Sequence, residues 1–109
     1  MSITATQSAQ PASTANVAVG SYITTGTAAA IVITTGFKPR YVKVENETSR
    51  DGYEWFEGMA DAEAIKHVAA GTRTLITTLG VTVSASGFTI GLDTDVNVTS
   101  QQISWLAIG

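Results

Sequence analysis

The chain carries few side chains that could do acid–base or nucleophilic chemistry, and His67 is its only histidine. Histidine is the side chain that most readily exchanges a proton near neutral pH, so a base of that type would have to be this residue. Serines and threonines are plentiful, but no Gly-x-Ser-x-Gly segment marks one of them as a nucleophile. We therefore expect His67 to lie at the surface or at an interface rather than in a catalytic site.

The segment 93–97 begins like a calcium-binding loop. Asp93, Asp95 and Asn97 supply oxygen atoms at loop positions one, three and five. The sixth position is Val98 and the twelfth is Ser104, where such a loop needs a glycine for its sharp turn and a glutamate as bidentate ligand. We expect a turn in which the acidic side chains accept hydrogen bonds from nearby backbone N–H groups, and no metal ion.

Acidic residues are concentrated in the middle of the chain, where a pair of glycosidase carboxylates could in principle be found. Seven acids in nineteen positions do not specify a pair, and a catalytic acid needs an apolar pocket that raises its pKa. We expect a solvated acidic surface formed by Glu45, Glu47, Asp51, Glu54, Glu57, Asp61 and Glu63. The chain has no cysteine and no phosphate-binding glycine motif, so we expect no cofactor and no enzymatic activity; a small hydrolase remains a distant alternative.

The distribution of charge indicates an assembly. Six basic and nine acidic side chains give a net charge of −3, which disfavours nucleic acid as a partner. Residues 1–37, 74–92 and 96–109 carry no charge at all. A free monomer normally mixes both signs over its surface, so we expect much of this neutral surface to be covered by other subunits. The longest aliphatic run, 28–33, is too short to span a membrane, and residues 1–20 lack the pattern of a secretory signal.

The elements that must position these residues are predicted to be strands. Thr, Val and Ile supply 36 residues against 4 Leu, and β-branched side chains favour a pleated sheet. Glycines and small polar residues interrupt the chain every eight to twelve positions, which is typical of an antiparallel β-sandwich, of jelly-roll or Greek-key type, with about seven to nine short strands. Residues 1–16 are small and polar and are predicted to form an N-terminal arm, followed by a single domain over 17–109.

Individual segments give more specific expectations. Alternation in 40–45 points Val42 and Val44 toward the core, and the Asp51-Gly52 dipeptide predicts a hairpin. The apolar run 28–35 is expected to be buried on both faces, and 61–71 is expected to form a short helix or an irregular loop. Further strands are predicted at 17–19 and 22–24, broken at 20–21, and at 74–77, 81–84, 88–90, 95–98 and 103–108.

The aromatic segment after the hairpin turn is a candidate binding surface. Alternation places Tyr53 and Trp55 on one face of a strand and Phe56 on the other. Exposed aromatic rings beside acids serve both sugar-binding surfaces and protein interfaces. Trp105 is expected to be a core residue.

The chain resembles small virion proteins of tailed bacteriophages. The likeness lies in a Gly-Phe-x-Pro strand at 36–39 with its continuation to Asn46, a Gly-Phe-Thr-x-Gly strand at 87–91, the turn with Asp93 and Asn97, and a terminal aromatic-x-Ala strand at 105–107. It covers roughly residues 34 to 108. A looser likeness is to H-type lectin domains, which have a Pro-x-Val strand and a late Gly-Phe strand.

This resemblance implies a capsid decoration protein that binds the major capsid protein on the outer surface of the virion and is made in the host cytoplasm. It implies a homo-oligomer, a trimer by the likeness. The alternative is a tail or head fibre module that binds host carbohydrate, the only case in which a carbohydrate partner is expected. The interface candidates are Ser2 and Ile3 in the arm, Tyr22 and Ile23 in the first strand, and Tyr53 and Trp55.

Overall fold

The computed structural model describes residues 16–109, which form eight β-strands. Their bounds are β1 Val17–Ile23, β2 Ile31–Thr34, β3 Tyr41–Asn46, β4 Gly52–Phe56, β5 Glu63–His67, β6 Arg73–Ser84, β7 Gly87–Ile90 and β8 Gln102–Ile108. This described part has no helix long and apolar enough to cross a membrane. The predicted arm falls almost entirely on residues 1–15, which lie outside the described residues.

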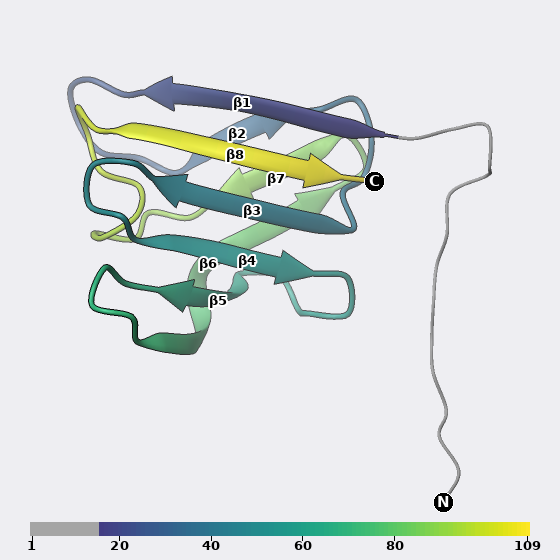
Figure 1. Cartoon of the computed structure of the whole chain (residues 1–109). Coiled ribbons are helices and arrows are strands. Elements are labelled where there is room, and N and C mark those ends of the chain that lie inside the picture. Colours follow the sequence, from purple (N-terminus) through teal and green to yellow (C-terminus); the bar gives the residue numbers. More distant parts are fainter. Residues whose placement is uncertain (1–15) are drawn as a thin grey trace, which may run out of the picture.

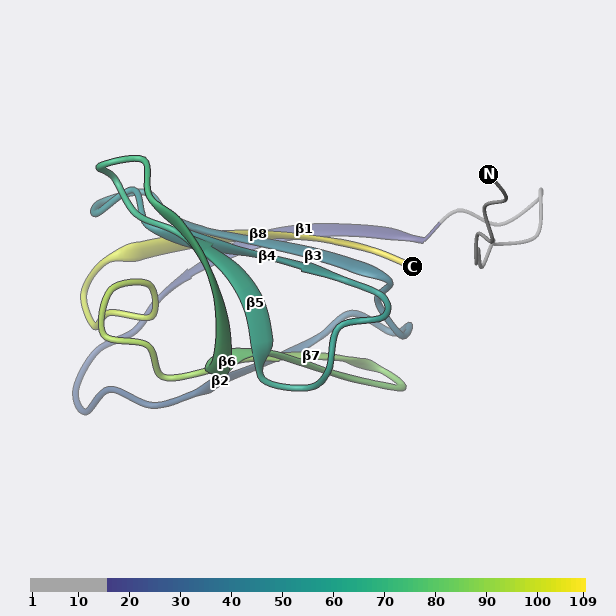
Figure 2. The same cartoon turned by 90° about the horizontal axis from the view of Figure 1, so that it is seen from below.

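All eight strands belong to one sheet with the order β1-β8-β3-β4-β5-β6-β7-β2, and every neighbouring pair is antiparallel. The sheet curls over on itself, so that β1, β8, β3 and β4 lie across from β7 and β2, while β5 and β6 join the two sides (Figures 1 and 2). The antiparallel all-β prediction is confirmed. The core, however, is enclosed by one continuous sheet rather than by two separate sheets.

The sheet folds over at a crease in β6. The pairing of β5 with β6 jumps from Ala64 opposite Ile76 to Glu63 opposite Val81. Between these pairs Leu79 takes a positive φ of 61°, and the Gly80 N–H donates to the Ala62 carbonyl at 3.0 Å. A bulge of this kind bends its strand sharply. The segments 74–77 and 81–84, predicted as two strands, are therefore the two halves of one bent strand.

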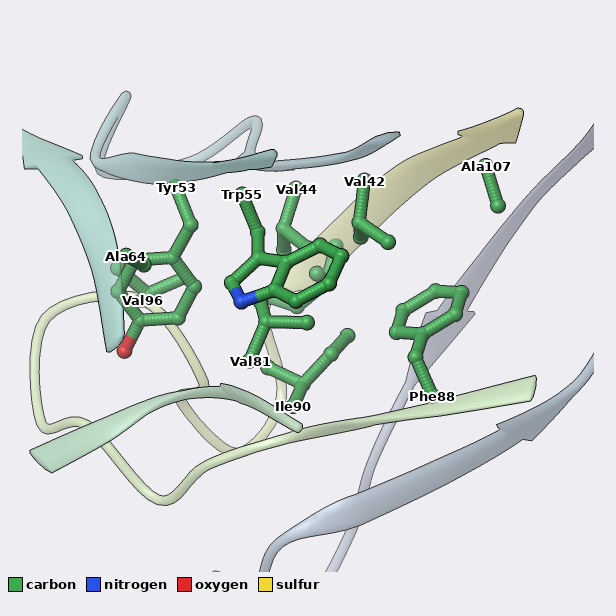
Figure 3. Packing of buried hydrophobic residues seen from close by; sticks show 11 residues of the cluster. Val42, Val44, Tyr53, Trp55, Ala64, Val81, Phe88, Ile90, Val96 and Ala107 are labelled. Carbon is green, nitrogen blue, oxygen red and sulfur yellow. The ribbon is translucent and has the colours of Figure 1, made fainter. Parts of the chain in front are cut away.

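The core fills the space between the two sides of the curled sheet (Figure 3). Val42 and Val44 are fully buried, as the alternation in β3 predicted. Trp55 and Tyr53 lie directly opposite them on β4 and point to the same side, which makes the β3–β4 hairpin the centre of the core. The remaining buried apolar residues are Ala64, Val81, Phe88, Ile90, Val96, Ile103 and Ala107.

Four local predictions are wrong. The first strand, predicted to break at residues 20–21, is the single strand β1, which pairs with β8 without interruption. Residues 63–67 form β5 rather than a short helix or an irregular loop, because residues 65–67 pair with β4 on one side and β6 on the other. Residues 95–98 form a turn rather than a strand. The run 28–35 is not buried on both faces: β2 is a four-residue strand at the end of the sheet, and Val32 is exposed.

Candidate interaction surface and polar network

An apolar row runs across the outer side of the sheet, away from the core. The strand registers align one residue from each of four neighbouring strands, in the order Val17, Ile108, Tyr41 and Phe56. The two aromatic rings at its end meet edge to face, with centroids 5.1 Å apart. The same side of β1 also presents Val19 and Ile23. We name these six residues the outer apolar patch.

Most of this patch is open to solvent. Val17, Val19, Ile23, Phe56 and Ile108 are all classed among the exposed large hydrophobic residues. Single exposed apolar residues are ordinary, but a contiguous group arranged by strand register is typical of a surface that another molecule covers.

Charged groups lie next to the aromatic end of the patch. The Tyr41 hydroxyl donates to Glu54 at 2.8 Å, and Arg73 forms an ion pair with the other oxygen of the same carboxylate, also at 2.8 Å. Hydrogen bonds from Arg73 and Tyr41 hold the pKa of Glu54 below its usual value. Burial and the bond to Glu54 raise the pKa of Tyr41 to about 12, so its hydroxyl remains a donor at neutral pH.

His67 lies on a neighbouring row of the sheet and is paired with an acid. Its Nε2 lies 2.7 Å from Glu45 Oε2, a contact that crosses Gly52 on the strand between them. The next residue on that row beyond Glu45 is Ser104, whose hydroxyl donates to Glu47. Ser104 and His67 are three strand spacings apart, about 14 Å. A hydrolytic triad needs the histidine between the hydroxyl and the acid, whereas here the acid lies between them.

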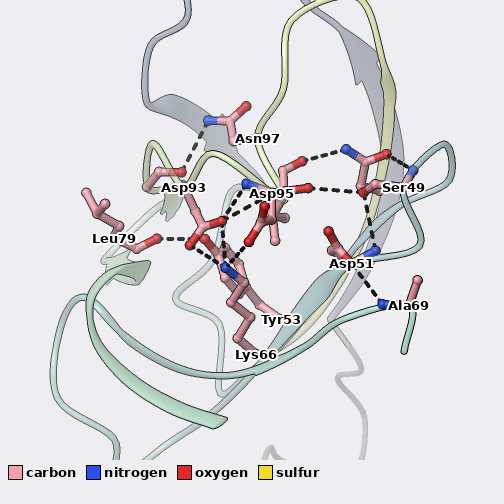
Figure 4. Close-up of polar contacts among 12 residues, drawn as sticks. Ser49, Asp51, Tyr53, Lys66, Ala69, Leu79, Asp93, Asp95 and Asn97 are labelled. Carbon is pink, nitrogen blue, oxygen red and sulfur yellow. Dashed lines mark hydrogen bonds and ion pairs between the residues drawn. The ribbon is translucent and has the colours of Figure 1, made fainter. Parts of the chain in front are cut away.

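The segment that begins like a calcium loop is held by a lysine (Figure 4). Lys66 Nζ lies 3.0 Å from Asp93 and 2.7 Å from Asp95. Burial acts to lower the pKa of Lys66, but the hydrogen bonds to Asp95 and Asp93 outweigh it and raise that pKa above its usual value. Asp93 Oδ1 also accepts the backbone N–H of Asp95 at 2.8 Å, which is the expected Asx turn.

The other predicted acids make local contacts. Asp51 accepts the backbone N–H of Ala69 at 2.9 Å, and Glu63 accepts that of Ala60 at 2.8 Å. Within the described residues, no group of three or more His, Asp or Glu side chains is arranged to hold a metal ion. The acidic side chains of this segment therefore stabilise loops and strand ends through hydrogen bonds.

Two of the predicted interface residues are core residues instead. Tyr53 is 0% exposed and Trp55 is 3% exposed, so neither offers a ring to a ligand or partner. The Trp55 indole N–H donates to the Ala60 carbonyl at 3.3 Å. The alternation predicts correctly that Tyr53 and Trp55 share a face. That face packs into the core and is not exposed to solvent. The signal that could have decided it is the hairpin, which sets both rings opposite Val42 and Val44.

The other interface candidates fall in three places. Ile23 is exposed at the end of the outer apolar patch. Tyr22 points inward, and its hydroxyl donates to Asn97 Oδ1 at 3.0 Å; burial raises the pKa of Tyr22 to about 12. Ser2 and Ile3 lie outside the described residues.

Trp105, expected in the core, is half-buried and packs edge to face on Phe88.

Sequence reasoning missed most of the patch. Val17, Val19 and Ile108 belong to predicted strands but were not singled out as candidates, and Phe56 was noted only as lying opposite Trp55 in the alternation. Their grouping depends on β1 pairing with β8 and β8 with β3, which joins segments far apart in the chain. The available signal was the absence of charge in residues 1–37 and 96–109.

Two shallow hollows lie in the surface of the described residues. One lies beside the patch and is lined by Val19, Lys43, Glu45, Ser104, Trp105 and Leu106. The other lies at the loop end and is lined by Ala28, Leu92, Thr94, Asn97, Val98 and Thr99. Neither is lined by the set of convergent titratable groups that a catalytic pocket uses.

Comparisons with known proteins return no relative: no family model, no curated protein and no solved structure matches the chain. The resemblance to phage virion proteins therefore stays a prediction, carried by the motifs between residues 34 and 108.

Proposed function

We propose that this protein is a structural protein of a phage virion that decorates the outer surface of the capsid and stabilises it, without enzymatic activity. The observation that carries the proposal is the outer apolar patch, an exposed row built across four strands. Burial of apolar area is the dominant favourable contribution in most protein–protein association. A surface of this kind binds through contact area and needs no pocket.

The position of the patch suits a partner that is itself a large protein surface. Its members lie on one side of the sheet, the side that faces away from the core. The major capsid protein, repeated over a shell, is the partner proposed. Because decoration multiplies one contact by the number of copies, a modest gain per copy would stabilise the whole shell.

The N-terminal segment has a place in this proposal. Residues 1–16 contain no charge and lead directly into Val17, which belongs to the patch. A chain segment attached there can reach across the neighbouring capsid surface and add to the edge of its sheet.

The carbohydrate-binding alternative has less support. It relied on Tyr53 and Trp55 as stacking platforms, and both rings are buried. Of the exposed large hydrophobic residues in the described part, Phe56 alone is aromatic. A sugar site normally combines such a ring with several convergent polar groups. The polar groups nearest Phe56 are the Tyr41 hydroxyl, Glu54 and Arg73, and these are already bonded to one another.

The direct test is co-sedimentation of the purified chain with capsids that lack it. We expect binding by the unmodified chain and a loss of binding with Phe56→Ser, because truncation of an interface anchor commonly costs about 1–4 kcal/mol per site. Leu75→Ser is the matched control. Leu75 is 58% exposed against 45% for Phe56, but it lies on β6, outside the patch.

The outcomes separate the candidates. Loss of binding with Phe56→Ser and not with Leu75→Ser supports decoration through the patch. Absence of capsid binding by the unmodified chain would contradict the proposal. A glycan array with clear binding would favour the fibre module, and a Phe56-dependent array signal would place the sugar on the patch itself.

A further inference from the structure

The edge of the sheet formed by β1 carries backbone hydrogen-bonding groups that no other strand of residues 16–109 uses. β1 pairs with β8 on one side and, within residues 16–109, with no strand on the other. The Gly109 N–H donates to the Asn16 carbonyl at 2.8 Å, so the backbone of Asn16 faces β8. In an antiparallel ladder alternate residues face the same neighbour. Ala18, Gly20 and Tyr22 therefore also face β8.

The backbone groups of the other β1 residues point away from β8, in the plane of the sheet. The backbone N–H and C=O groups of Val17, Val19, Ser21 and Ile23 point to the free edge. Edge strands that stay single are usually protected by a lysine, a proline or a bulge. β1 has none of these: its sequence is VAVGSYI, and its register with β8 is unbroken.

We propose that β1 pairs with β1 of a second copy of this chain, antiparallel and about a two-fold axis at Gly20. In this register Val17 lies opposite Ile23 of the second copy, and Val19 lies opposite Ser21. All four outward-facing residues of each strand then exchange both of their backbone hydrogen bonds, which gives eight bonds in total. A shift by two residues in either direction leaves one of these four residues in each strand without a partner.

The side chains fit the same register. The pair at the axis is Gly20 with its own copy, a non-hydrogen-bonded pair in which the strands approach most closely. No side chain is present there to interfere. On the inner side Trp105 covers Gly20, since a Cβ at that position would lie 2.5 Å from the indole ring. On the outer side Val17 meets Ile23, so the apolar patches of the two copies become continuous.

Charge favours a second copy over a charged partner. Each chain has a net charge of −3, yet residues 1–37 carry none of it. Pairing through β1 therefore joins the two copies at uncharged strands and brings no like charges together within either β1. The same neutral composition gives no attraction to a basic or acidic partner at this edge.

The size of the contact predicts its strength. A seven-residue strand spans about 24 Å, and a contact of that length falls at or below the lower end of the roughly 1,200–2,000 Å² buried by stable complexes. We therefore expect a reversible dimer with a dissociation constant in the micromolar range or above. This differs from the trimer implied by the phage resemblance, and it does not depend on capsid binding.

The test is sedimentation velocity of the full chain from low micromolar to near-millimolar concentration. We expect a monomer–dimer equilibrium that Val19→Lys weakens by about tenfold or more, since an edge lysine disfavours strand addition. Val32→Lys is the matched control. Val32 is 73% exposed against 74% for Val19, and it lies on β2, the strand at the opposite edge of the same sheet.

Amide hydrogen exchange gives a second readout that needs no substitution. As concentration rises, the amides of Val17, Val19, Ser21 and Ile23 should become protected. Those of Ala18, Gly20 and Tyr22 already bond to β8 and should change little. Protection that also appears at Val32 on β2 would indicate pairing of β1 with β2 of another copy and would overturn the two-fold proposal.

Other results would also overturn the proposed pairing of β1 with β1 of a second copy. A monomer at all concentrations, or a trimer, contradicts the proposal. So does a dimer that Val19→Lys leaves unchanged while the variant remains folded by circular dichroism. A dimer that disappears when residues 2–15 are removed would assign the β1 edge to the N-terminal segment. A dimer that survives this removal and is lost with Val19→Lys supports pairing through β1.

Discussion

The Tyr53 hydroxyl donates a 2.8 Å hydrogen bond to the Leu79 carbonyl, and this bond joins the centre of the core to the crease in β6. Tyr53 lies on the β4 side of the curled sheet, and Leu79 lies where β6 bends toward the other side. Leu79 has a positive φ, an unfavourable conformation for a branched side chain. A fixed donor at its carbonyl therefore helps to hold the bend.

Removing this hydroxyl should destabilise the fold. We expect Tyr53→Phe to lower the free energy of unfolding by about 1–2 kcal/mol, because the ring still fills the core while the Leu79 carbonyl loses its donor. Chemical denaturation measures the change. Tyr41→Phe is the control, since its hydroxyl bonds Glu54 on the outer side; an equal or larger loss there would contradict a special role for the crease.

The crease also requires a residue without a side chain at position 80. A Cβ at Gly80 would lie 2.6 Å from the Glu63 carbonyl oxygen and 2.7 Å from that of Ala62. Both are backbone atoms that cannot rotate away, so Gly80→Ala should cost about 1–3 kcal/mol or prevent folding.

Gly26→Ala is the comparison for Gly80→Ala. Gly26 has a φ of 82° but open space around it, so its substitution should cost only about 1 kcal/mol of backbone strain. Thermal unfolding of both variants tests the difference. A smaller loss for Gly80→Ala than for Gly26→Ala would show that the strand can shift to accept the methyl group.

Calcium should not stabilise the protein. The Lys66 ammonium lies between the Asp93 and Asp95 carboxylates, where a cation of the loop would bind. We expect no change in the unfolding temperature when Ca²⁺ is added. A rise that depends on Asp93 would mean that the ion displaces Lys66.

Substitution of Lys66 should show how much its ion pairs contribute to the free energy of unfolding. Lys66→Met leaves Asp93, which is largely buried, without its ion pair, and we expect a loss of about 1–3 kcal/mol in the free energy of unfolding. Lys43→Met is a control on the neighbouring exposed face. Equal effects of the two substitutions would contradict the assigned role of Lys66.

Acid should weaken the contact of Glu54 with Arg73 and Tyr41. The hydrogen bonds from Arg73 and Tyr41 hold the pKa of Glu54 below its ordinary value in the fold. The stability that Glu54 contributes is therefore present above that ordinary value and is lost as pH falls through the lowered pKa. Because Arg73 is more than half exposed, we expect its contact with Glu54 to contribute less than about 1 kcal/mol to the free energy of unfolding. Glu54→Gln should flatten the fall of stability between about pH 5 and pH 3; an unchanged slope would contradict this.

The sequence predicted the elements whose pattern is local. In β3 the alternation of valines with polar residues is unambiguous, and the Asp51-Gly52 dipeptide marked the turn before β4. For Tyr53 and Trp55 the period of two showed which rings share a face, but it cannot show which face is inside. That choice follows from the partner strand, here from Val42 and Val44.

Elsewhere long-range pairing overrode local preference. Residues 61–71 contain good helix formers, but a segment under three turns gains little from helix formation alone. Ala62 adopts a positive φ of 68°, and Ile65 and Lys66 pair with strands on both sides. The contact of Lys66 with Asp93 joins residues 27 positions apart, so no spacing rule could place a lysine in the loop.

The pairing of β1 with β8 also constrains the order in which the molecule can form. Val17 lies opposite Ile108, and β8 in turn separates β1 from β3, so the first strand of the described chain is held by the last. On a ribosome, β1 has no place in the sheet until residues 102–108 have emerged. During that interval an uncharged strand able to pair on both sides is exposed, and its protection depends on how fast the chain is completed or on a chaperone that covers it.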